Sequence, residues 1–83
     1  MSYELINALM EHLEEEYEDL VSYDKLADKA MEHGHKELAH YLNMIKRDEL
    51  SHAEYLEMYL KSHDVPLSSK VLDEKKKYNE RVM

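Results

Sequence analysis

The sequence predicts an all-α protein, built as an antiparallel helical hairpin with a short C-terminal helix. Its 83 residues contain one Gly and one Pro, so residues that interrupt helices are scarce. The stretches between them are rich in Glu, Leu, Ala, Lys and Met, which favour the helical backbone. Apolar residues recur every three or four positions, which is the spacing of one helix face.

The first expected helix covers residues 3–32, a stretch with neither Gly nor Pro. Ser2 is its expected N-cap, because a serine hydroxyl can accept a hydrogen bond from a free amide of the first turn. Gly34 is expected to end it in the left-handed conformation, which glycine adopts at little cost. Its apolar stripe runs through Leu5, Leu9, Leu13, Leu20, Ala27 and Met31.

The second expected helix covers residues 36–63 and ends at Asp64-Val65-Pro66. Its stripe advances in alternating steps of four and three, as in a coiled-coil seam. The stripe consists of Leu38, Leu42, Ile45, Glu49, His52, Leu56, Tyr59 (or Leu60) and His63. A third helix is expected over residues 69–81, with Lys75, Lys76 and Lys77 on its solvated face.

Two segments follow from this pattern, a hairpin over residues 1–63 and a linker with a tail helix over residues 64–83. A chain of this length buries only about 60% of its unfolded surface. It has no Cys, so no disulfide can reinforce it. We therefore expect a homodimer in which two hairpins form a four-helix bundle, and higher homo-oligomers built from it.

Charge and hydropathy exclude several function classes. The chain has 11 Lys and Arg against 19 Asp and Glu, a net charge of −8, which argues against nucleic acid as a partner and favours cations. No apolar run reaches the roughly 18 residues of a membrane span. No basic segment followed by an apolar one opens the chain, so no signal peptide is expected. The expected location is the cytoplasm.

Polar residues within the apolar stripes indicate the candidate site. Glu49 and His52 interrupt the second stripe, and Glu16 stands between Leu13 and Leu20 in the first. Glu16 and His52 are equally far in sequence from Gly34, so a turn there places them side by side. A buried carboxylate is costly unless it is paired or bound to a metal.

Glu49 and His52 form Glu-x-x-His, whose members share a helix face and can bind one metal ion. Two such motifs, with one Glu from each of two other helices, form the di-iron carboxylate site of four-helix bundles. One chain supplies half of this set, Glu16, Glu49 and His52. Two chains would supply four carboxylates, which balance the charge of two divalent ions.

Glu16 followed by Tyr23, with Arg47-Asp48-Glu49 leading into His52-Ala53, resembles one half of a ferritin-family bundle. A single helix pair with a tail helix is similar to the encapsulated ferritins. The resemblance covers residues 11–63. It implies a di-iron ferroxidase that oxidises Fe(II) for iron storage and detoxification.

The resemblance also assigns roles to residues. It implies that Glu16, Glu49 and His52 ligate iron, that Tyr23 lies beside it, and that Glu15 and Glu18 hold metal on its way to the centre. Two departures are present. Ser22 stands where the family often has Trp, and the encapsulin-loading peptide is not seen. Packaging in an encapsulin shell therefore stays open.

Simpler interpretations exist for the same residues. Tyr23 is also typical of core packing, and Glu15 and Glu18 of a solvated acidic face. A Glu-His pair can fix the register of a non-catalytic helical homodimer without binding metal. Another di-metal carboxylate enzyme, such as a peroxide reductase, uses the same ligand types. His12 is expected at the boundary of the first stripe, outside the site.

Overall fold

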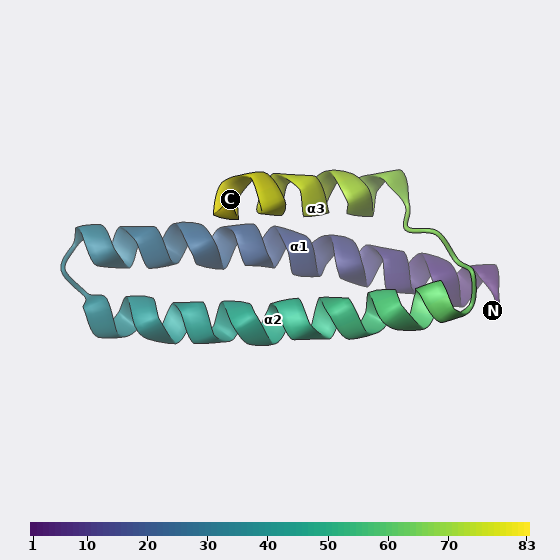
Figure 1. Cartoon of the computed structure of the whole chain (residues 1–83), viewed down its shortest axis with the longest axis horizontal. Coiled ribbons are helices and arrows are strands. Elements are labelled where there is room, and N and C mark those ends of the chain that lie inside the picture. Colours follow the sequence, from purple (N-terminus) through teal and green to yellow (C-terminus); the bar gives the residue numbers. More distant parts are fainter.

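The computed structural model describes residues 1–83 and contains three helices and no strands. They are α1 (Tyr3–Glu32), α2 (Lys36–Ser62) and α3 (Ser69–Val82) (Figure 1). The three predicted helices are confirmed, and their ends differ from the predicted ones by no more than one residue. The agreement is close because capping residues and helix breakers act locally.

The helix ends show how the sequence sets these boundaries. The Ser2 hydroxyl accepts a hydrogen bond from the Leu5 amide at 3.2 Å, and the Ser68 hydroxyl accepts one from the Val71 amide at 3.3 Å. Gly34 follows α1 with φ of +79°, a left-handed conformation that costs other residues about 1–2 kcal/mol. The His35 amide donates back to the Ala30 carbonyl at 2.8 Å, which closes the turn.

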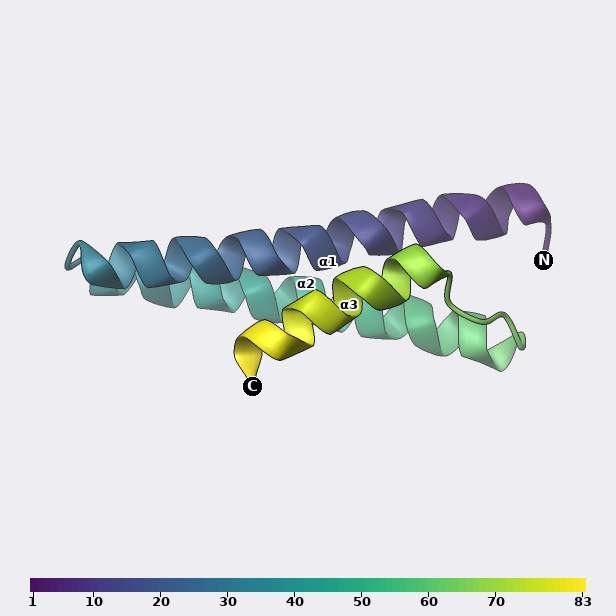
Figure 2. The same cartoon turned by 90° about the horizontal axis from the view of Figure 1, so that it is seen from above.

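The two long helices lie side by side and antiparallel, and α3 runs in the same direction as α1 (Figures 1 and 2). The backbone of α3 approaches α1 but not α2. The molecule is therefore elongated, with extents of 48 × 20 × 19 Å. The sequence had not indicated which surface the tail helix would cover, and the structure places it along α1.

The core lies where the three helices meet. Leu13, Leu20, Leu60 and Val71 have no exposed surface, and Tyr17 retains 1%. Each such aliphatic side chain contributes roughly 1.5–3 kcal/mol when it leaves water. Only 12 of 83 residues are buried, which is a thin core for a chain that must stay folded alone.

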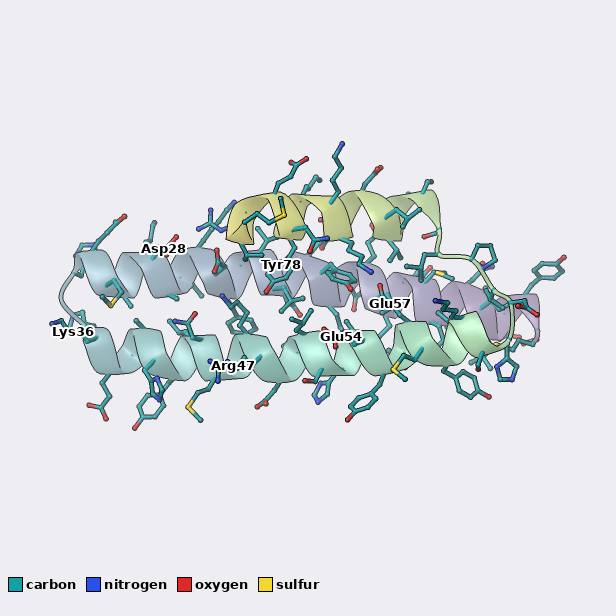
Figure 3. All side chains as sticks on the ribbon, in the orientation of Figure 1. Asp28, Lys36, Arg47, Glu54, Glu57 and Tyr78 are labelled. Atoms are coloured by element: carbon teal, nitrogen blue, oxygen red, sulfur yellow. The ribbon has the colours of Figure 1, made fainter.

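Charged side chains join α3 to both long helices. Two of their partners, Asp28 of α1 and Glu57 of α2, are labelled in Figure 3. Arg81 of α3 lies 2.6 Å from Asp24 and 2.7 Å from Asp28, and Asp24 also pairs with Lys46 of α2 at 2.8 Å. The expectation that all three lysines of α3 face solvent was wrong for Lys75. It is half-buried because it reaches across to α2.

None of the three helices combines the length and the apolar composition that crossing a membrane requires.

Candidate metal centre

One side of the hairpin is left without a cover. The α1 residues that meet α3 include Met10, Tyr17 and Asp24. Successive residues of a helix are rotated by about 100°, so Glu16 points away from the side that α3 covers. We call this uncovered side the open face. It comprises Leu5, Leu9, His12, Glu16, Tyr23 and Leu26 of α1, and Leu38, Leu42, Ile45, Glu49, His52, Leu56 and Tyr59 of α2.

The open face is apolar along most of its length. Leu5, Leu26, Leu38, Ile45 and Tyr59 are each between 40% and 54% exposed, while Leu9 and Leu56 pack partly against the core. An exposed apolar surface of this kind is stabilised when another surface covers it. The predicted site residues therefore interrupt a surface that is suited to contact with other helices.

Glu16 is the buried acid of this face. It retains 6% exposure, and its Oε1 lies 2.8 Å from Nε2 of His12, one helical turn earlier. Its second carboxylate oxygen, Oε2, is buried and has no hydrogen-bond partner. Burying such an unpaired polar atom costs free energy. A hydrogen-bond donor or a cation beside this oxygen would offset that cost.

The electrostatic surroundings of Glu16 include the other two predicted ligands. Burial raises the pKa of Glu16, and the nearby charge of His12 opposes this shift. Glu49 raises the pKa further, and His52 lowers it. Glu49 is half-buried and His52 is exposed at the rim. These three residues share one region, and within one chain no three acidic or histidine side chains converge on a metal-sized point.

The remaining predicted residues lie around this region. Tyr23 is half-buried on the α1 stripe, two turns after Glu16. Glu15 and Glu18 are exposed, and the charge of Glu18 reaches Lys77 of α3. Glu18 therefore faces the α3 side of α1, away from Glu16.

Sequence reasoning missed the contact of His12 with Glu16. The available signal was the spacing His-x-x-x-Glu, which places both side chains on one helix face. His12 had been placed at the edge of the stripe because the apolar positions alone defined the face. Its side chain is 58% exposed and leans onto the buried carboxylate.

A second buried polar group lies on the opposite side of the hairpin. The Tyr17 hydroxyl donates to Glu57 at 2.9 Å, and Lys75 donates to both oxygens of Glu57 at 3.2 Å. Burial, together with the bond to Glu57, raises the pKa of Tyr17. The largest surface hollow, about 800 Å³, adjoins Glu57 and Lys75 rather than Glu16.

The structure thus offers a buried acid with one free oxygen, an adjacent imidazole, and a Glu-x-x-His pair within electrostatic reach. Comparison with protein families, with curated proteins and with solved structures finds no match to this chain.

Proposed function

We propose that the protein is a ferritin-like ferroxidase, in which two copies join their open faces and enclose a di-iron site. Each copy contributes Glu16, Glu49 and His52. The observation that carries the proposal is the buried Oε2 of Glu16, which has no partner and lies on an uncovered face. A second copy brings its own half-site to the same face, so one ligand set would satisfy both chains.

The donor set fits iron. Carboxylate oxygens and imidazole nitrogens suit Fe, Mn and Zn, and no thiolate is present to favour Cu(I). Four carboxylates from two copies would neutralise two divalent ions, which removes the penalty of burying like charges together. The negative charge of −8 also concentrates Fe(II) around the protein.

Each residue has a definite task in this arrangement. Glu16 and Glu49 bind through oxygen, which favours Fe(III) over Fe(II), and His52 presents a neutral ring nitrogen. Two irons held by these residues would together supply two electrons, enough to reduce one dioxygen to hydrogen peroxide or one hydrogen peroxide to two waters, with two protons taken from solvent. Tyr23, two turns from Glu16, would hydrogen-bond a ligand near the metal. Glu15 would hold arriving cations, a role that the position of Glu18 on the α3 side of α1 does not favour.

Storage requires more than one bundle, because four packed helices leave no internal cavity. Mineral would therefore form inside a larger homo-oligomer or in a compartment such as an encapsulin shell. The outer flank of α2 offers a further contact surface, because Tyr55 and Met58 are 70% and 66% exposed there.

The direct test is the oxygen-dependent rise in ferric absorbance after Fe(II) is added anaerobically and air is admitted. Glu49→Ala and His52→Ala should each reduce the initial rate at least a hundredfold, because each removes a ligand from the proposed centre. Glu54→Ala is the matched control, since it removes a carboxylate of α2 outside the open face. Unchanged rates in either ligand variant would reject the assignment.

A second test links metal to assembly. Without metal, four carboxylates would face one another across the interface, so chelation should weaken the dimer. Light scattering at low micromolar concentration should report a smaller mean mass with chelator than with Fe(II). Identical masses under both conditions would contradict the linkage.

One observation favours a second function. The His12–Glu16 contact already pairs one oxygen of the buried carboxylate within a single chain, so a non-catalytic homodimer could accommodate Glu16 without a metal. Elemental analysis of protein incubated with iron and then desalted separates the two functions. About one iron per chain supports the ferroxidase, and none supports the homodimerisation module.

A further inference from the structure

We infer that His12 is an additional metal ligand, so that each chain binds the ion pair through two imidazoles and two carboxylates. This inference rests on the proposed function but adds a residue that the Glu…Glu-x-x-His pattern does not contain. It starts from a contact in the structure, in which Nε2 of His12 lies 2.8 Å from Oε1 of Glu16.

That separation suits two ligands of one ion. Metal–nitrogen and metal–oxygen bonds at such sites are about 2.0–2.2 Å, so ligands at right angles lie about 3 Å apart. The His12 nitrogen and the Glu16 oxygen are already at nearly this spacing, and both belong to consecutive turns of α1. Binding would therefore require only small side-chain rotations and no movement of the helix.

The surroundings leave His12 free for this task. Its ring is 58% exposed on the open face, and its contact with Glu16 is the only ion pair it makes. To ligate, the neutral ring carries its proton on Nδ1 and presents the Nε2 lone pair to the metal. Glu16 loses this hydrogen bond but gains the ion, and its orphaned Oε2 becomes available as a second oxygen ligand.

Two imidazoles per chain also affect metal preference. Imidazole suits Fe, Co and Zn, whereas Mn(II) is better served by carboxylate and water. Loss of His12 should therefore weaken Co(II) binding more than Mn(II) binding. This difference separates a ligand from a residue that only shapes the site, because a distorted site would weaken both ions alike.

The experiment titrates the full-length protein with Co(II) and records affinity and the proton NMR spectrum of the loaded form. His12→Ala and His12→Gln should each weaken Co(II) binding at least tenfold. Mutation of a residue that only hydrogen-bonds a metal ligand already lowers metal affinity by about 10–100-fold. The wild type should show two hyperfine-shifted exchangeable imidazole N–H signals per chain, and both variants one. His40→Ala is the matched control, an exposed histidine outside the open face.

Three results would overturn the inference. One is a His12→Gln variant with wild-type affinity, which would show that a hydrogen bond to Glu16 is enough. Another is a wild-type spectrum with a single exchangeable imidazole signal per chain that His52→Ala removes. A wild type that binds no Co(II), with Glu49→Ala equally inert, would reject the proposed function together with this ligand.

Discussion

Glu16 and Tyr17 are adjacent in sequence, but their side chains point to different sides of α1. Glu16 faces the open face with one oxygen unpaired, whereas Tyr17 is bonded to Glu57 beneath α3. Both groups are buried and polar, and burial raises the pKa of each. The two groups differ in their hydrogen bonding. The tyrosine hydroxyl has an acceptor, whereas one oxygen of the carboxylate has no donor. The paired hydroxyl stabilises the fold, and the free oxygen of Glu16 is the observation on which the proposed metal site depends.

Tyr17→Phe should lower the free energy of unfolding by about 2 kcal/mol, because it removes a buried hydrogen bond to a charged acceptor. Urea denaturation followed by circular dichroism measures the change. Tyr55→Phe is the control, since Tyr55 is 70% exposed, and its effect should stay within about 0.5 kcal/mol. Equal effects in the two variants would show that the Tyr17–Glu57 bond adds nothing.

The raised pKa of Tyr17 predicts a loss of stability in alkali. In the unfolded chain the phenol ionises near pH 10, whereas the folded chain holds its proton to higher pH. The contribution of Tyr17 is therefore complete below about pH 10 and declines above it, because only the unfolded state gains by ionising there. The stability gap between wild type and Tyr17→Phe should narrow between about pH 10 and 11. If the difference in unfolding free energy between wild type and Tyr17→Phe stayed constant over this range, the raised pKa of Tyr17 would be contradicted.

The candidate ligands could be predicted because they interrupt a regular pattern. Glu16, Glu49 and His52 stand at apolar positions, and periodicity alone reveals such intruders. The partners of buried groups were not accessible in this way. His12 on Glu16, and Lys75 on Glu57, depend on rotamers and on the path of α3, which no spacing within a single helix specifies.

At the scale of elements, the extent of each helix could be predicted but the position of α3 could not. Caps at Ser2 and Ser68, and the reversal at Gly34, are read from a few adjacent residues. Val71 and Tyr78 indicate an apolar face on α3, but this pattern does not predict which helix the face packs against. In the structure this face packs on α1, where Tyr78 meets Tyr17, and Arg81 lies beside Asp24 and Asp28.

Asp24→Ala should loosen α3, because Asp24 is paired with both Lys46 of α2 and Arg81 of α3. These groups are partly exposed, so we expect a loss of about 1 kcal/mol rather than the larger cost of a buried pair. Amide hydrogen exchange should accelerate in residues 69–82 before it does so in α1. Asp48→Ala, which removes an exposed acid of α2, is the control. Uniform acceleration along the chain would contradict a specific role at α3.

At the scale of the whole molecule, the dominant feature is an apolar surface without a cover. The core is thin because apolar residues that could extend it lie exposed on the open face. The sequence predicted a partner from chain length and from the width of the stripes. The sequence could not specify which side of the hairpin would be left uncovered, because that depends on where α3 packs.

Ile45→Glu should prevent pairing through the open face, because it places a charge within the apolar surface beside Glu49. Sedimentation equilibrium should then give the monomer mass of 10.0 kDa, against a dimer for the wild type. Leu72→Glu is the control, because Leu72 is 51% exposed on α3. A dimeric Ile45→Glu protein would locate the interface elsewhere.

The path of α3 has a consequence for how larger particles would be built. Because α3 shields one flank of the hairpin, a pair joined at the bare flank would carry both tail helices on its outside. Any further contact between pairs would then involve surfaces that take no part in holding metal. If the proposed di-iron dimers assemble into a larger particle, substitutions on those outer surfaces should separate it into dimers that still bind iron. Particle size could then be changed without changing the metal site.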